Sequence, residues 1–315
     1  MQRTQRITVV GAGLMGHAIA LEFALNGFEV RVYDTRAEAL ADLRDRARQT
    51  AAPLVQIGLV AAPDLEAGLA RLHPTADLAA TCADAEYLVE AVSEDLALKQ
   101  QLYRELDRLC PPGTIFASNT SSLPPSELGA ATSRPDRVLV AHYFNPPHLI
   151  PVVEIVLGRE TSQATADATA ALLRRIGKTP ALVKREVVGF VANRLQAALL
   201  REALALVEQG VADVESVDAI VRLGFGRRLA VFGPFAIADL AGLDVWAAIA
   251  RVIFPTLDTT PTPPPLLAER VAQGQYGAKT SAGFYPWPTD RLQAALAERD
   301  AELLHRLAAD RRRSE

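Results

Sequence analysis

Short apolar runs alternate with helical stretches along the first part of the chain. The runs that predict strands cover residues 6–10, 29–33, 85–92, 114–119 and 137–144. Runs of this length and composition are typical of strands that are covered on both faces. The alternation predicts an α/β domain built on a parallel, doubly wound sheet, in which ligands bind outside the carboxyl ends of the strands.

Strand patterns end near residue 187, and the rest of the chain has helical periodicity. Helices are predicted at 189–209, 213–223, 237–253 and 291–311. We therefore predict two domains, an α/β domain over residues 1–187 and an all-helical domain over residues 188–315.

A glycine-rich segment, GAGLMG at 11–16, follows the first strand and opens a helical run at 14–26. Asp34 then lies at the end of the second strand. A glycine-rich turn between strand and helix, with an acidic residue after the next strand, is the arrangement of a Rossmann-type dinucleotide-binding unit. A tight strand-to-helix turn without a ligand is the alternative.

The glycines of this segment have separate physical roles. The first permits the tight turn, the second lets the backbone approach a pyrophosphate, and the third lets the helix pack close to the strand. The helix start offers free N–H groups to phosphate. Asp34 can accept hydrogen bonds from the ribose hydroxyls and would repel a 2′-phosphate, which favours NAD; Arg36 nearby leaves NADP open. The residues predicted to bind the cofactor here are Gly11, Gly13, Leu14, Met15, Gly16 and Asp34.

A histidine and a glutamate lie on either side of a proline-rich segment. His142 lies near the end of the run at 137–144, and Glu154 interrupts a second apolar run at 151–157. A carboxylate in such a run needs a partner, because burying an unpaired charge is costly. If the chain reverses direction in the intervening NPPHLIP, the carboxylate can orient the imidazole as a general base. A structural ion pair or two plain surface residues are the alternatives.

Polar residues also follow two other predicted strands. Glu94 comes after the strand at 85–92, and SNTSS at 118–122 comes after the strand at 114–119. Because the carboxyl ends of parallel strands meet at one edge of a sheet, these residues are expected to share a cleft with the histidine. Capping of the following helices is the structural alternative.

Residues 37–72 form a charged helical excursion that carries Arg44, Arg46, Arg48 and Arg71. We expect these arginines to lie on a solvated face. Contact with a phosphate-bearing tail of the substrate is the alternative.

The composition narrows the choice of partners. The chain of 315 residues has a formal net charge of −4 and a pI of about 5.8, which gives no reason to expect nucleic acid or an anionic membrane as a partner. Cys82 and Cys110 show no CxxC spacing and no disulfide framework, which indicates a reducing compartment. No signal peptide or membrane span is predicted, and no metal site. We expect a cytoplasmic protein.

Eight motifs together resemble the 3-hydroxyacyl-CoA dehydrogenases and their relatives. They are GAGLMG at 11–16, VSEDLALK at 92–99, SNTSSL at 118–123, HYFNPP at 142–147, VVEIV at 152–156, GFVANRL at 189–195, GPFAIADLAGLD at 233–244 and KTSAGFYPW at 279–287. The resemblance covers nearly the whole chain and is far more specific than the glycine-rich turn alone. It implies that residues 1–187 bind NAD and that the helical domain binds substrate and forms a homodimer.

The resemblance also implies roles for individual side chains. His142 would be the general base and Glu154 its orienting partner, while Ser121 and Asn193 would hydrogen-bond the substrate oxygen. A histidine suits this task near neutral pH, because its unperturbed pKa is about 6.5. Ser121 as a helix cap and Asn193 as a helix-start residue are the alternatives. His148 is the rival base, but it lies inside the turn.

Three further residues are implied to lie near the nicotinamide and its ribose. They are Glu94, Lys99 and Asn119. Lys99 as a surface helix residue is the alternative for that position.

The first expectation for function is oxidation of an L-3-hydroxyacyl-CoA of the 3-hydroxybutyryl type to the 3-keto product, in fatty acid metabolism. Two departures from the acyl-CoA enzymes support another substrate. The excursion at 37–72 lacks the lysine that those enzymes tend to place against the coenzyme, and NPPHLIP is closer to relatives that act on small free hydroxy acids. These relatives include carnitine dehydrogenases, L-gulonate 3-dehydrogenase and lambda-crystallin, diketoreductases and a pyridine hydroxymethyl-acid dehydrogenase. A non-catalytic relative is the third hypothesis.

Overall fold

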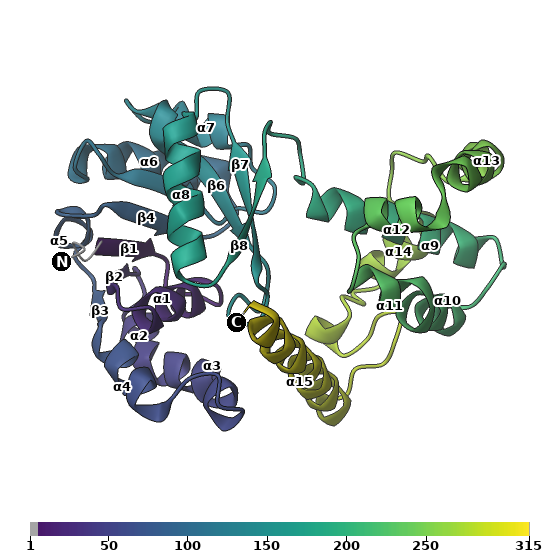
Figure 1. The fold of residues 1–315 in the computed structure, drawn as a ribbon, viewed down its shortest axis with the longest axis horizontal. Coiled ribbons are helices and arrows are strands. Elements are labelled where there is room, and N and C mark those ends of the chain that lie inside the picture. Colours follow the sequence, from purple (N-terminus) through teal and green to yellow (C-terminus); the bar gives the residue numbers. More distant parts are fainter. Residues whose placement is uncertain (1–5, 315) are drawn as a thin grey trace. The chain divides into compact units, whose positions relative to one another are not determined.

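The computed structural model describes residues 6–314, which form two compact units (Figure 1). The first unit comprises the residues up to 193 together with those from 298 onward, and the second comprises residues 194–297. The predicted division at 187/188 lies a few residues before this boundary. It also differs at the C-terminal end, because the last part of the final helix belongs with the first unit.

An eight-stranded sheet forms the centre of the first unit. Its strands are β1 Arg6–Val10, β2 Glu29–Tyr33, β3 Leu72–Thr75, β4 Tyr87–Glu90, β5 Ile115–Ser118, β6 Val138–Tyr143, β7 Val152–Leu157 and β8 Thr179–Val183. The strand order is β3-β2-β1-β4-β5-β6-β7-β8. All neighbouring pairs are parallel except β6–β7, which is antiparallel. The predicted doubly wound α/β fold is confirmed, with one reversed step where β7 turns back along β6.

Helices surround this sheet. They are α1 Gly16–Leu25, α2 Ala37–Ala41, α3 Leu43–Gln56, α4 Ala62–Ala70, α5 Leu78–Cys82, α6 Leu96–Leu109, α7 Pro125–Gly129 and α8 Gln163–Arg175, with a 3₁₀ turn η1 at Pro135–Arg137. The part of α15 (Thr289–Ser314) that belongs to this unit packs Leu304 against Leu54 of α3 and Leu149 of the β6–β7 turn.

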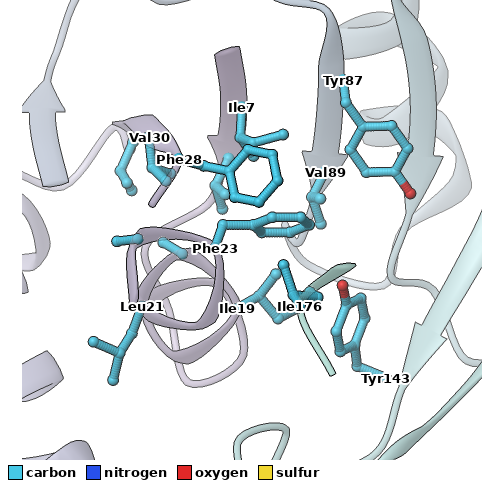
Figure 2. Close-up of a cluster of buried hydrophobic side chains, with 14 of the residues drawn as sticks. Ile7, Ile19, Leu21, Phe23, Phe28, Val30, Tyr87, Val89, Tyr143 and Ile176 are labelled. Atoms are coloured by element: carbon cyan, nitrogen blue, oxygen red, sulfur yellow. The ribbon is translucent and has the colours of Figure 1, made fainter. Parts of the chain in front are cut away.

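Alternate strand residues supply two separate hydrophobic clusters, because successive side chains of a strand point to opposite faces. Val9 and Val89 join one cluster, which also contains residues of α1, α3 and α8. Figure 2 shows part of this cluster, including the rings of Phe23 and Phe28. These two rings pack edge to face, with their centroids 5.7 Å apart. Leu88 belongs to the other cluster, with residues of α5 and α6. A sheet covered on both faces explains why its strands are continuous apolar runs.

The second unit is helical. Most of α9 (Ala192–Glu208) lies in it, with α10 Val214–Ile220, a π-helical turn η2 Val221–Phe225, α11 Gly226–Leu229, α12 Pro234–Ala241, α13 Leu243–Ile253, η3 Phe254–Thr256, α14 Pro265–Ala272 and η4 Ala278–Thr280. The helix predicted at 237–253 is two helices, because the chain turns at Gly242 with a φ of +96°. Among the described residues, no helix combines the length and apolar character that crossing a bilayer requires.

Candidate active site

The antiparallel pairing of β6 and β7 places His142 directly opposite Glu154. The NPPHLIP turn reverses the chain, and its Asn145–Pro146 peptide bond is cis. His142 Nδ1 lies 2.8 Å from Glu154 Oε2, and each residue is 4% exposed. The carboxylate that the sequence leaves without a partner therefore has the imidazole as its partner, at the carboxyl end of β6.

Glu154 is also held by backbone N–H groups. Its Oε1 accepts hydrogen bonds from Val191 at 3.2 Å and Ala192 at 3.0 Å, at the start of α9. Gly189 and Phe190, both with positive φ, make the sharp turn that aims these N–H groups at the carboxylate. Burial alone would raise the pKa of Glu154, but the hydrogen bonds from His142 and from these backbone groups outweigh burial and lower the pKa. Glu154 is therefore an ionised carboxylate that accepts a hydrogen bond from His142 Nδ1–H.

The other imidazole nitrogen faces Ser121. His142 Nε2 lies 3.1 Å from Ser121 Oγ, and Asn193 Nδ2 donates to the Ser121 carbonyl at 3.0 Å. With Nδ1–H donating to the carboxylate, a neutral His142 has its free lone pair on Nε2; this tautomer is assigned from the hydrogen bonds. Hydrogen bonds thus connect the four residues that the resemblance implies to be catalytic, namely Ser121, His142, Glu154 and Asn193.

Two aromatic rings, neither singled out by the sequence, pack on the imidazole. The Phe144 ring is centred 4.8 Å from the His142 ring, and the Phe190 ring is centred 5.6 Å from it. Phe190 is fully buried. These contacts restrict the imidazole to one orientation.

Glu94 organises the loop that contains Ser121. Its Oε1 accepts hydrogen bonds from Thr120 Oγ1 at 2.5 Å, the Ser121 N–H at 3.1 Å and Ser122 Oγ at 2.8 Å. Burial would raise its pKa, but these hydrogen bonds and the charge of Lys99 lower it. Glu94 therefore holds this loop as an ionised acceptor.

Lys99 is buried, with 1% of its surface exposed, so the alternative of a surface residue is wrong. Its ammonium donates to Glu90 Oε1 at 2.6 Å and to the Val92 carbonyl at 3.2 Å, and it lies 3.7 Å from Glu94 Oε2. Glu90 also accepts from Ser118 Oγ at 2.6 Å. Sequence reasoning did not single out Glu90, although it carries the same signal as Glu154, a carboxylate inside an apolar run.

Asn119, which follows β5, hydrogen-bonds to the ends of both β4 and β6. Its Oδ1 accepts a hydrogen bond from the Tyr143 N–H at 2.9 Å, and its own N–H donates to the Glu90 carbonyl at 2.7 Å. These contacts bring the ends of β4, β5 and β6 to one edge of the sheet, where the predicted polar residues converge.

The glycine-rich segment has the geometry that a dinucleotide requires. Gly11 has a φ of +103°, and a Cβ there would lie 2.6 Å from the Ala91 carbonyl oxygen. A Cβ on Gly16 would lie 1.7 Å from the Gly11 carbonyl oxygen, so the helix can start this close only with glycine. Gly13 has open space beside it, its nearest neighbour being Arg36 Nη2 at 3.9 Å. The backbone can therefore be approached at Gly13.

A cavity of about 720 Å³ opens beside this segment. It is lined by several predicted cofactor residues and by one predicted catalytic residue, namely Gly11, Gly13, Leu14, Met15, Asp34, Asn119 and Ser121. Glu94 and Lys99 do not line this cavity, but Glu94 accepts a hydrogen bond from the lining residue Ser121 and Lys99 donates one to the lining residue Val92.

Asp34 stands at the end of this cavity with both oxygens engaged. Oδ2 accepts from the Ala12 N–H at 2.8 Å, and Oδ1 accepts from the Arg36 N–H at 2.9 Å. The exposed Arg36 guanidinium also forms an ion pair with the Asp34 carboxylate. Burial raises the pKa of Asp34, but the hydrogen bonds from Arg36 and Ala12 lower it overall, so the aspartate is ionised. An ionised acceptor here fits the ribose of NAD.

The arginines of the excursion already have partners. Arg44 donates to the Leu72 carbonyl, Arg46 donates to the Ala12 and Ala39 carbonyls, and Arg71 donates to the Ala24 carbonyl. Arg48 pairs on the surface with Asp45 and Glu66. Arg44 and Arg48 are exposed, as expected for a solvated face, whereas Arg46 and Arg71 are half-buried. The hydrogen bonds of Arg44, Arg46 and Arg71 to carbonyl oxygens also hold the backbone in place.

Two family models together match most of the chain. Residues 6–187 match the family model of the 3-hydroxyacyl-CoA dehydrogenase NAD binding domain, and residues 189–287 match the model of the 3-hydroxyacyl-CoA dehydrogenase C-terminal domain. Among the described residues, no group of His, Cys, Asp and Glu side chains is arranged to hold a metal ion.

Several relatives span nearly the whole chain. The 5-formyl-3-hydroxy-2-methylpyridine 4-carboxylate 5-dehydrogenase of Mesorhizobium japonicum is 35% identical over 300 residues, which are 95% of this chain and 96% of that protein. A solved structure of a dehydrogenase with this substrate name, described as an NAD⁺-dependent dismutase, has a TM-score of 0.90 at 34% identity and covers 96% of this chain and 97% of its own. A probable 3-hydroxybutyryl-CoA dehydrogenase of Bacillus subtilis is 37% identical over 287 residues, 90% of this chain and 97% of that protein. The chain belongs to the 3-hydroxyacyl-CoA dehydrogenase family and is an NAD-dependent oxidoreductase that acts on CH–OH groups.

Proposed function

We propose that this enzyme oxidises the hydroxyl of a small free hydroxy acid, with His142 as the general base. The observation that carries the chemistry is the hydrogen-bonded chain from Glu154 through His142 to Ser121, with distances of 2.8 Å and 3.1 Å. Oxidation of a secondary alcohol releases a proton and a hydride, so a base must lie beside the hydroxyl.

In this mechanism the substrate hydroxyl lies beside His142 Nε2, near the Ser121 hydroxyl. Nε2 takes the hydroxyl proton, and the imidazolium that results is stabilised by the Glu154 carboxylate through Nδ1. Ser121 and Asn193 supply dipoles to the substrate oxygen while it changes from alcohol to carbonyl. The bound NAD supplies the hydride acceptor. In the reverse direction the imidazolium protonates the carbonyl oxygen.

The residues proposed to hold NAD belong to the cavity and its support. The backbone of Gly11 and Gly13, with Leu14 and Met15 just before α1, would hold the pyrophosphate, and Gly16 permits this approach. Asp34 would accept hydrogen bonds from the adenosine ribose. Glu94, Lys99 and Asn119 shape the nicotinamide end, Lys99 through its contacts with Glu90 and Glu94.

The contacts that the arginines at 37–72 make within the protein support a free hydroxy acid as the substrate over a CoA thioester. CoA carries several phosphate charges, and cations are the groups that bind them. Arg44 and Arg46 are committed to backbone carbonyls. Arg48 is neutralised by two acidic neighbours. The similarity to a dehydrogenase of a pyridine carboxylate supports the same substrate class.

The test is NADH formation with matched substrates. L-3-hydroxybutyrate and L-3-hydroxybutyryl-CoA are compared, beside carnitine, gulonate and 5-formyl-3-hydroxy-2-methylpyridine 4-carboxylate. We expect a free acid to have the highest kcat/KM. A higher value for the thioester, together with a rise in its KM in Arg48→Ala, would overturn the substrate assignment.

We also infer that the second unit forms a homodimer interface. Large apolar side chains on α12 and α13 are exposed, among them Phe235 at 86%, Leu240 at 73% and Val252 at 71%. Apolar surface of this extent is typical of protein interfaces. Molar mass measured by light scattering tests this inference, and a monomer at micromolar concentration would contradict it.

A further inference from the structure

We propose that Lys178 is a positioning residue for the catalytic histidine. Its ammonium fastens the β6–β7 turn to helix α1 and thereby keeps His142 in register with Glu154. This inference rests on the proposed role of His142 as the base, and it adds a residue outside the cleft to the machinery.

Local structure places Lys178 where it can do this. Helix α8 ends with Gly177 in a left-handed conformation, at a φ of +75°, and the Lys178 N–H closes the helix end by donating to the Leu173 carbonyl. The next residue, Thr179, starts β8 and pairs with Val152 at the start of β7. The Lys178 side chain therefore leaves the backbone beside the β6–β7 turn, and it is 4% exposed.

The ammonium has three donors, and three acceptors surround it. Nζ lies 2.5 Å from the Pro147 carbonyl oxygen, 3.0 Å from the Ile150 carbonyl oxygen and 2.5 Å from Glu22 Oε1. The two carbonyls belong to the turn, on either side of His148 and Leu149. A compact ammonium suits three converging acceptors, whereas a planar guanidinium does not. This accounts for a lysine at this position in a chain whose basic residues are mostly arginines.

The turn needs such an anchor because it has few hydrogen bonds of its own. Three prolines remove backbone donors, and the hydrogen bonds within the turn run from the Leu149 and Ile150 N–H groups to the Pro146 carbonyl, both at 3.1 Å. Phe144, at the entrance of the turn, packs its ring 4.8 Å from the His142 ring. A shift of the turn would therefore move Phe144 and loosen the imidazole.

Glu22 makes the anchor two-sided. Glu22 lies on α1, the helix that begins at the glycine-rich segment. Lys178 therefore connects α1 to the β6–β7 turn. Burial raises the pKa of Glu22 to about 7, against the opposing effect of Lys178. Its Oε2 has no hydrogen-bond partner. Glu22 therefore contributes a single contact, and the two carbonyls receive the other donors.

A purely structural ion pair is the competing explanation, and a double variant separates the two. Lys178→Met alone leaves the Glu22 carboxylate buried without its partner and can simply fail to fold. Lys178→Met/Glu22→Met removes both charges and keeps apolar volume, but it leaves the Pro147 and Ile150 carbonyls without the ammonium. If only the charges matter, the double variant has wild-type catalysis.

The experiment measures kcat, KM for NAD and the pH profile of kcat/KM for wild type and for the double variant. We expect kcat to fall about 10- to 100-fold, because a misplacement of about 1 Å at a catalytic group costs up to about 10²-fold. KM for NAD should change little. The acidic limb of the profile should move to lower pH, because His142 is held less closely to the Glu154 carboxylate. Hydrogen exchange at the amides of residues 148–150 should become faster.

Arg134→Met is the matched control. Arg134 pairs with Asp107 at 2.7 Å and donates to the Pro111 and Cys110 carbonyls, so it too holds a loop with one carboxylate and several carbonyls. That loop lies away from the β6–β7 turn, so we expect lower stability with an unchanged pH profile. Wild-type kcat and an unchanged pH profile in the folded double variant would overturn the proposal. The same shift in Arg134→Met would also overturn it. An active His142→Gln enzyme would instead contradict the proposed function.

Discussion

The two units of this chain treat their apolar side chains differently. In the first unit, Phe23 is fully buried and Phe28 is 2% exposed. In the second, Phe235 and Leu240 are 86% and 73% exposed. The first unit completes its own hydrophobic core, whereas the second presents apolar surface that a further protein surface must cover to remove it from water.

Charged groups show the same contrast, because every buried charged side chain among the described residues lies in the first unit. The first unit buries Lys99, Lys178 and Glu154, each with a partner of opposite charge or an imidazole. Buried charges survive only with such partners, so their placement is specific. The comparison teaches that the proposed chemistry belongs to the first unit and that the proposed self-association belongs to the second.

The largest effect on catalysis is expected when the proposed base of the first unit is removed. His142→Gln should lower kcat by about 10²–10⁴-fold, because the substrate hydroxyl loses its proton acceptor. Stopped-flow and steady-state NADH formation measure the loss, and NAD affinity by calorimetry is the control that should stay unchanged. Wild-type activity would show that the chemistry is elsewhere.

Glu154→Gln should have the next largest effect, a loss of roughly 10²-fold in kcat/KM. The imidazolium loses its anionic neighbour, so the acidic limb of the pH profile of kcat/KM should move to lower pH.

The stability of Glu154→Gln gives a second measurement. The pKa of Glu154 is lowered from 4.5 by folding, so its stabilising contribution is present above pH 4.5 and is lost as pH falls through the lowered value. The stability gap between wild type and variant should therefore narrow in acid, as chemical denaturation at several pH values would show.

Asp34→Ser tests the other end of the first unit. The loss of charged hydrogen bonds to the ribose should lower kcat/KM for NAD by about 10- to 100-fold, since one such bond contributes about 1.5–3 kcal/mol. The ratio of NADP to NAD activity should rise, because the 2′-phosphate is no longer repelled and Arg36 is free to meet it. An unchanged ratio would show that Asp34 does not select the cofactor.

The smallest effect on catalysis is expected from the second unit. Phe235→Glu/Leu240→Glu should convert a dimer to a monomer in light scattering, because charged residues in the apolar surface oppose association. Activity should change less than in any variant above. A loss as large as that in His142→Gln would show that the active site needs the association, and the contrast between the units would have to be redrawn.

The sequence predicted the elements whose signals are local. The β1–glycine–α1–β2 unit, β6, β7 and the reversal between them lie where the patterns indicate, because periodicity and glycine or proline positions act over a few residues. β3 was missed, since Leu72–Thr75 is short, contains a proline and has one buried residue. The sequence predicts one helix over 237–253, where the structure has two that are separated at Gly242. The apolar pattern does not reveal the left-handed conformation of this glycine.

For the site, the sequence by itself determined which residue types could perform the chemistry, and near which strand ends they lie. Only the tertiary structure decided their partners. It buried Lys99 against Glu90, gave Arg46 backbone carbonyls as hydrogen-bond acceptors, and brought the start of α9 to Glu154. The physical reason is that a charge in a chain has no fixed partner until folding removes water from it. The partners that then satisfy it come from segments far apart in sequence, which no local pattern encodes.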